Sequence, residues 1–484
     1  MPVVHKVIFK NVVWLSVSEV INSVLLYLFT VLVAKYLGAE KYGQISFALS
    51  ASTLFAVLID FGLGVFTIRE VSRHIELSKK YFSAIFSLRL VLSVFYIGLM
   101  FLIAAISHKG AVVVYLVMLT AIYMVIYNLT QACVAIYRSQ EKMNFEAISK
   151  VLYSIILFGG GLLVTWKTLD LVYFGWVYVF ASFAALIYSL IVLHKYFVKI
   201  SFSFDYKFWQ YLIKQSWPFT LSLVFVNIYY FMDSFLLGLL SGDKEVGWYN
   251  AGYKIVFFVL LFANVFVGVF FPVISKLYKE SVARLKLLLG NFSKLMIIIA
   301  VPLGFGVTII GPKLLVFIFG EDFSGGGLAF QILMWGAAVT YLNTVYGNSL
   351  QACDRQKTYA KGVGLGAAVN LILNLILIPF YSLNGSAAAT LVTALVLLFY
   401  MYFKFRKIVS VKFTPYLLKP VLAAIGMGIF LYVFRNMNIL LILFGGIVIY
   451  FVLLLITGGI TRQEISFYRS LMKKQEKADE LQKI

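Results

Sequence analysis

Charged side chains recur within long apolar stretches of this 484-residue sequence. If such stretches cross a membrane, each charge is costly unless it is paired or faces water, so the charges mark a candidate site. Acids and bases placed in this way can bind an anionic group and can also offer sites for a coupling proton or sodium ion. The charges that we select as candidates are Glu19, Asp60, Arg89 and Lys150 in the first part of the chain, and Asp233 and Lys254 in the second.

The elements that carry these residues are predicted from hydropathy. The sequence is 62% hydrophobic and 13% charged, whereas soluble domains are about a quarter charged. A helix spans a bilayer with roughly 20 apolar residues, and the apolar runs of this length do not alternate as the strands of a β-barrel would. We therefore predict an all-α polytopic membrane protein with about fourteen helices. The runs lie near residues 12–34, 43–66, 82–106, 111–136, 145–166, 169–193, 217–240, 248–274, 291–311, 328–350, 361–380, 384–403, 415–434 and 438–458.

We attribute the formal net charge of +21 to loops that determine how the chain is oriented in the membrane. If the N-terminus is cytoplasmic, the loops on its side hold about four times as many Lys and Arg as the opposite loops, which is the bias that sets membrane orientation. We expect a protein of the cell membrane with both termini in the cytoplasm. The positive charge is therefore not interpreted as a nucleic-acid-binding surface.

Four of the intramembrane charges are expected at one level of the first half. Counting about 1.5 Å per residue, Glu19, Asp60, Arg89 and Lys150 lie roughly 9–14 Å from the cytoplasmic ends of their helices. We propose that they share a polar floor that can attract an anionic group. Alternatives stay open, because Asp60 and Arg89 are also suited to holding helices together, and Lys150 to extending toward the membrane surface.

Asp233 and Lys254 flank a predicted hairpin and lie roughly 9–11 Å from its outer end. Opposite charges at the same depth are natural partners. The sequence leaves open whether such a pair neutralises itself within the packing or contacts cargo.

Other chemistry is poorly supported by the sequence. No His, Cys or acidic cluster has metal-ligand spacing, and no phosphate-binding loop for ATP is present. Cys133 and Cys353 lie at or near predicted cytoplasmic helix ends, where a disulfide is not expected. We predict no catalytic residues, no cofactor and no metal.

A weak internal repeat indicates two related halves. Residues 38–43 (GAEKYG) and 242–247 (GDKEVG) both join two apolar runs through a short polar turn bounded by glycines. Residues 60–64 (DFGLG) match 264–268 (NVFVG) at the same offset. Parallel repeats of this kind occur in alternating-access transporters, with the substrate between the halves.

These segments also resemble a known family. Residues 37–43 (LGAEKYG) and 60–64 (DFGLG), followed by Arg69 and Glu70, resemble the opening of the polysaccharide (oligosaccharide) flippases of the multidrug/oligosaccharidyl-lipid/polysaccharide exporter superfamily. In the second half, residues 233–238 (DSFLLG) and 246–251 (VGWYNA) resemble its passage from helix 7 to helix 8.

The resemblance implies two six-helix lobes in a V, with two further helices beside them. On this basis we divide the chain into an N-lobe at 1–200, a C-lobe at 201–410, helices 13 and 14 at 411–460, and a cytoplasmic tail at 461–484. The implied function is to flip polyprenyl-diphosphate-linked oligosaccharide from the cytoplasmic to the outer leaflet for cell-surface polysaccharide synthesis.

Two rival functions come from the same superfamily. One is lipid II flipping, for which we expect more arginine in the cavity. The other is cation-coupled drug antiport. A rival of a different class is a membrane polysaccharide polymerase or ligase, which would need a sizeable outer loop with reactive groups, whereas the largest outer loop here, residues 311–327, has few charges. The partners that we expect are the lipid-linked oligosaccharide, membrane lipids, a coupling proton or sodium ion, and polysaccharide-assembly proteins.

Overall fold

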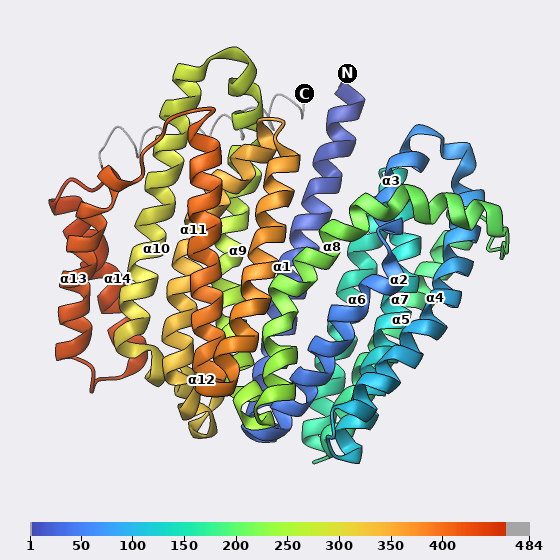
Figure 1. Ribbon diagram of the computed structural model, residues 1–484, viewed down its shortest axis with the longest axis horizontal. Helices are drawn as coiled ribbons and strands as arrows, with labels where there is room; N and C mark the ends of the chain where they lie inside the picture. The colour runs from blue at the N-terminus through green and yellow to red at the C-terminus, as the bar shows by residue number, and fades with distance from the viewer. Residues whose placement is uncertain (1, 461–484) are drawn as a thin grey trace. The chain divides into compact units, whose positions relative to one another are not determined.

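The computed structural model of the protein describes residues 2–460, and every regular element in that range is a helix (Figure 1). The predicted all-α class is confirmed. The tail predicted at 461–484 lies outside the described residues.

The chain forms two compact units, which divide between Leu239 and Leu240. The elements of the first unit are α1 Pro2–Phe55, α2 Val57–Asp60, α3 Leu63–Arg73, η1 Ile75–Leu77, α4 Ser78–Ile106, α5 Ala111–Ser139, α6 Met143–Trp166, α7 Leu171–Tyr196 and α8 Tyr206–Leu240. Those of the second are α9 Asp243–Glu280, α10 Val282–Phe319, η2 Glu321–Gly326, α11 Gly327–Ala352, α12 Gln356–Arg406, η3 Thr414–Tyr416, α13 Leu418–Val433 and α14 Ile439–Ile456. The boundary places α8 with the first unit, and the four-part division made from the sequence stays a prediction.

Within the described residues, 12 helical segments are long and apolar enough to cross a membrane. Two of them, Val13–Arg73 with 61 residues and Gln356–Arg406 with 51 residues, each contain two of the predicted runs. The protein is therefore a multi-pass membrane protein. The count of fourteen crossings stays a prediction.

Both of these long segments contain a sharp turn. The chain reverses in α1 at Gly38, whose φ is 75°, and Figure 1 shows the two legs of α1 running in opposite directions. Glycine adopts positive φ without steric cost. Helical structure resumes at once after Gly38, so Glu40 lies in the first turn of the second leg rather than in a loop, where its charge complements the helix dipole. The corresponding turn in α12 is at Ser382.

Each unit is organised around its own helix contacts. In the first unit α1 packs on α6, α6 on α7, α7 on α5, and α5 on α1, so these four helices form a closed ring. In the second unit α11 contacts α9, α10 and α12. The last two helices, α13 and α14, pack on each other and on α10, beside which they stand in Figure 1.

Candidate functional site

The run predicted at 43–66 is interrupted beside one of the candidate carboxylates. α2 ends at Asp60, and Phe61 and Gly62 both have left-handed backbone conformations, with φ of 45° and 68°, before α3 begins. The Thr220 hydroxyl of α8 donates a hydrogen bond of 2.8 Å to the Phe61 carbonyl. A Cβ on Gly62 would lie 2.8 Å from the Cβ of Phe219, so close packing against α8 also requires glycine.

Arg89 of α4 joins three helices at this break. Its side chain is 0% exposed and forms an ion pair with Asp60 of α2. Its Nη1 donates a 2.5 Å hydrogen bond to the main-chain carbonyl of Asn128 in α5. A guanidinium enclosed in this way has no free surface for cargo. The geometry favours the alternative in which Asp60 and Arg89 hold the helices of the first unit together.

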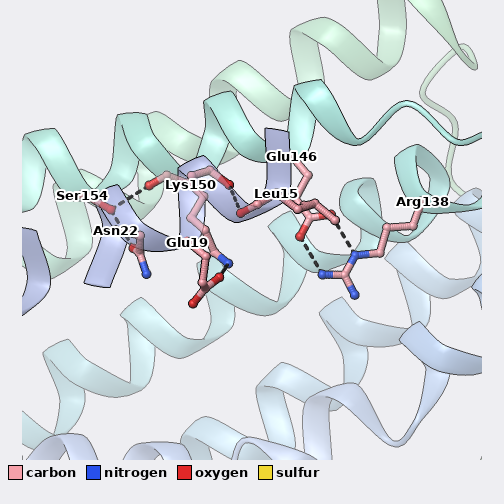
Figure 2. Close-up of polar contacts among 8 residues, drawn as sticks. Leu15, Glu19, Asn22, Arg138, Glu146, Lys150 and Ser154 are labelled. Atoms are coloured by element: carbon pink, nitrogen blue, oxygen red, sulfur yellow. Dashed lines mark hydrogen bonds and ion pairs between the residues drawn. The ribbon is translucent and has the colours of Figure 1, made fainter. Parts of the chain in front are cut away.

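Glu19 and Lys150 have different surroundings. Lys150 of α6 forms an ion pair with Glu19 of α1, and the two side chains are 32% and 53% exposed. One turn further along both helices, the Ser154 hydroxyl donates a 2.6 Å hydrogen bond to the Asn22 side chain. Figure 2 shows the two contacts in line along the α1–α6 contact. The structure therefore unites two of the predicted residues in an accessible polar surface.

A second pair, which the sequence analysis did not select, continues this surface. The Arg138 guanidinium at the end of α5 binds the Glu146 carboxylate of α6 in a bidentate manner, with distances of 2.8 and 2.6 Å (Figure 2). The Arg138 side chain is partly exposed, and that of Glu146 is buried. The run predicted at 111–136 ends before Arg138, whereas α5 extends to Ser139. The signal that could have identified the pair is two opposite charges eight residues apart across a tight turn.

The two ion pairs belong to one electrostatic group. The Arg138 guanidinium has electrostatic interactions with the Glu19 carboxylate and with the Tyr127 side chain. Tyr127 also has an electrostatic interaction with Glu146. We call Glu19, Lys150, Arg138 and Glu146 the paired-charge cluster. It presents two cations and two carboxylates from α1, α5 and α6.

Asp233 and Lys254 occupy α8 and α9, in different units. Asp233 is buried, and Lys254 is half-buried. Their pairing stays a prediction.

An ion pair also links the turn of α1 to the start of α7, at the other end of α6 from the paired-charge cluster. The Nζ of Lys41 lies 3.0 Å from Oδ1 of Asp170. The Asp170 carboxylate also caps α7 by accepting a 2.7 Å hydrogen bond from the Leu171 N–H. This hydrogen bond, together with Lys41, lowers the pKa of the Asp170 carboxyl. Such a cap fixes where α7 begins.

Within residues 2–460, no three His, Cys, Asp or Glu side chains are grouped so that they could hold a metal ion. Cys133 and Cys353 are both buried free thiols.

Comparisons with known proteins extend the description beyond geometry. The sequence pattern of the polysaccharide biosynthesis protein family matches residues 8–278, more than half of the chain. A protein of Haloferax volcanii named "Probable low-salt glycan biosynthesis flippase Agl15" is 23% identical over 392 residues, which cover 79% of this chain and 80% of that protein.

Two solved structures share the fold. The lipid II flippase MurJ in an inward closed conformation aligns with a TM-score of 0.76 at 15% identity, over 95% of this chain and 100% of that one. An inward-facing multidrug resistance MATE family transporter of the MOP superfamily aligns with a TM-score of 0.66 at 14% identity, over 82% and 98% of the two chains. At these identities the likeness concerns the fold alone.

Proposed function

This chain belongs to the polysaccharide biosynthesis protein family, and on that premise we propose that it flips lipid-linked oligosaccharides from the cytoplasmic to the outer leaflet of the cell membrane. The family match confirms the resemblance seen in residues 37–43 and 60–64. A relative named as a flippase and the fold shared with MurJ support the proposal. The cargo that we propose carries its sugars on a polyprenyl diphosphate.

The observation that carries this proposal is the accessibility of the paired-charge cluster. Glu19, Lys150 and Arg138 lie in helices long enough to span the membrane, and their side chains remain partly exposed. Lipid tails do not solvate charges, so this face of the first unit must meet water or a polar head group. A lipid whose polar head crosses the bilayer while its tail remains in the bilayer needs such a face.

We assign capture of the diphosphate to the two cations. Arg138 presents a planar fork that matches phosphate oxygens as well as it matches a carboxylate, and Lys150 adds a point charge. Glu19 and Glu146 keep these cations occupied when no cargo is bound, so the diphosphate must compete for them. Competition of this kind keeps the affinity low enough for release. The exposed Glu19 carboxylate also offers a site for a coupling proton or sodium ion.

The remaining candidates take supporting roles in this proposal. Asp60 and Arg89 hold α2 and α4 in place, and Asp233 and Lys254 act as a pair whose part in turnover is separate from capture. We place turnover in an alternating-access cycle of the kind typical of parallel repeats. We also propose that both termini are cytoplasmic, where the basic loops can contact polysaccharide-assembly proteins.

Lys150→Gln tests the proposal directly. Loss of a charged hydrogen-bond partner should weaken binding of a fluorescent lipid-linked oligosaccharide about tenfold and slow its flipping in proteoliposomes. Lys276→Gln is the matched control, because Lys276 forms a comparable exposed ion pair with Glu280 outside the cluster. Wild-type binding and flipping by the Lys150 variant, at equal protein levels, would show that the cluster does not capture cargo.

The same vesicles separate the rival functions. A lipid II flippase should move lipid II in preference to other lipid-linked sugars, and a drug antiporter should exchange an organic cation for protons or sodium. An enzyme of polysaccharide polymerisation should lengthen the sugar chain. We expect flipping without any change in the covalent structure of the cargo.

A further inference from the structure

Four tyrosines lie close together on α5, α6 and α7, three of the four helices of the ring. Tyr123 of α5 and Tyr153 of α6 are stacked, with ring centroids 6.2 Å apart and an interplanar angle of 15°, and their hydroxyls are 3.3 Å apart. The ring centroid of Tyr178 in α7 lies 5.3 Å from that of Tyr123. The ring centroid of Tyr127, one turn along α5, lies 6.2 Å from that of Tyr123. We call these four residues the tyrosine cluster.

The members of the cluster differ in accessibility. Tyr123 and Tyr178 are buried and pack the interior of the ring of helices, as aromatic residues commonly do. Tyr127 is 43% exposed, and Tyr153 is half-buried. Interior packing therefore explains two of the four tyrosines, and the other two expose part of their rings on the surface of the first unit.

The accessible tyrosines adjoin the paired-charge cluster. Tyr153 follows Lys150 by three residues on α6, so both side chains lie on one face of the helix. The Tyr127 hydroxyl is within electrostatic range of Arg138 and Glu146. Counted from the ends of α5 and α6 at about 1.5 Å per residue, the tyrosines lie roughly 15–18 Å deep, whereas Arg138 and Lys150 lie within about 11 Å. Tyr153 thus lies one turn from Lys150, and both accessible tyrosines are deeper in the membrane than the cations.

This position selects one kind of occupant. Exposed charges on the same surface disfavour lipid tails as the normal contact of these rings. A pyranose has a face of C–H groups that carry slight positive charge, and an aromatic ring has a negative face, so the two surfaces attract each other. The phenol hydroxyls add hydrogen-bonding capacity for sugar hydroxyls. A diphosphate held by the cations would bring its first sugar to this depth.

We propose that Tyr127 and Tyr153 bind the sugar ring adjacent to the diphosphate of the cargo. The inference rests on the proposed function and adds a sugar subsite to it. The diphosphate supplies affinity that is common to all cargo, and the tyrosines supply affinity that depends on a sugar being present.

The test compares two lipids, a prenyl diphosphate carrying one hexopyranose and the same prenyl diphosphate without sugar. Tyr127→Leu should weaken binding of the sugar-bearing lipid about 3- to 10-fold, which corresponds to the energy of one aromatic contact, and should leave binding of the bare lipid unchanged. Tyr127→Phe should retain most of the affinity, because the ring remains. Tyr115→Leu is the control, since Tyr115 lies on the same helix and is 44% exposed.

Equal weakening of both lipids by Tyr127→Leu, or no change in either, would overturn the sugar subsite. If the Leu variant does not accumulate, wild-type protein in nanodiscs supplies a second measurement. Saturation of the tyrosine ring protons should transfer to the sugar ring protons in NMR, and the transfer should vanish with ring-deuterated tyrosine. Transfer that survives deuteration would count against the subsite.

Failure of the proposed function has a different signature. If wild-type protein binds neither lipid, and Lys150→Gln changes nothing, the flippase proposal fails together with the subsite. If wild-type protein binds both lipids with equal affinity, and Lys150→Gln weakens both, capture of the diphosphate stands and only the sugar subsite is wrong.

Discussion

Arg89 and Lys150 are both cations within spanning helices, yet their surroundings indicate different roles. Arg89 is enclosed by α2, α4 and α5 and bound to Asp60 and Asn128. Lys150 is partly exposed, and its side chain pairs with Glu19, which is also exposed. Removing the charge of Arg89 should therefore affect folding, and removing that of Lys150 should affect binding.

Arg89→Gln should lower the stability of the folded protein by about 3 kcal/mol, because removing one member of a buried ion pair leaves the other without compensation. Thermal unfolding in detergent is the measurement. The double variant Asp60→Asn with Arg89→Gln should recover part of the loss. Lys150→Gln, which breaks an exposed pair, should cost less than about 1 kcal/mol. An Arg89 variant as stable as wild type but unable to bind cargo would show that Arg89 takes part in binding.

At the scale of elements, the break between α2 and α3 brings the Asp60 carboxylate to Arg89. The break depends on two left-handed residues and on close contact with α8. There the Thr220 hydroxyl donates to the Phe61 carbonyl, two residues after Pro218 within the same helix. An irregular backbone is tolerated at this depth because the neighbouring helix satisfies it.

Gly62→Ala should destabilise the first unit by about 1–2 kcal/mol or more, since an L-residue is disfavoured at positive φ and its Cβ would lie 2.8 Å from Phe219 and 2.9 Å from the Ser216 carbonyl. Gly98→Ala in α4 is the control. A Cβ on Gly98 meets no described atom within 4 Å, so this change should be neutral or slightly stabilising. Equal melting temperatures for the two variants would contradict the requirement for glycine at the break.

At the scale of the whole molecule, the bias of Lys and Arg predicts orientation. A cysteine at Ser324, which is exposed in η2, should react with an impermeant thiol reagent in intact cells. A cysteine at Ser470 should react only after the membrane is opened. The reverse pattern would invert the topology.

The native cysteines should react too slowly to interfere with this labelling experiment. Burial raises the pKa of the Cys353 thiol to about 11. The reactive thiolate is therefore scarce at pH 7 and increases only as the pH approaches 11. Wild-type protein in detergent should label slowly at pH 7 and faster at higher pH. Rapid labelling of Cys353 at neutral pH would show that the thiol is not enclosed.

The all-α membrane class and the family follow from the sequence alone. Hydropathy is a local property, because one helix must satisfy its own backbone groups in lipid whatever surrounds it. The reversal of the chain is also encoded locally, because glycine adopts the positive φ that it requires; it occurs at Gly38, the first residue of the turn predicted at 38–43. The sequence also identified Glu19 and Lys150 as charges that need a partner or water, and these two do pair.

Tertiary structure decided which charges meet and which stay accessible. Lys150 and Glu19 are 131 residues apart in sequence, and Asp60 and Arg89 are 29 apart, so no local rule selects these partners. Arg138 and Glu146 are only 8 apart, yet the sequence analysis missed the pair because the run predicted at 111–136 ends before Arg138, whereas α5 extends to Ser139. Enclosure of Arg89 and exposure of Tyr127 arise from the packing of several helices at once. An unpaired charge is costly in lipid, but what a charged side chain does depends on the neighbours that the fold brings to it.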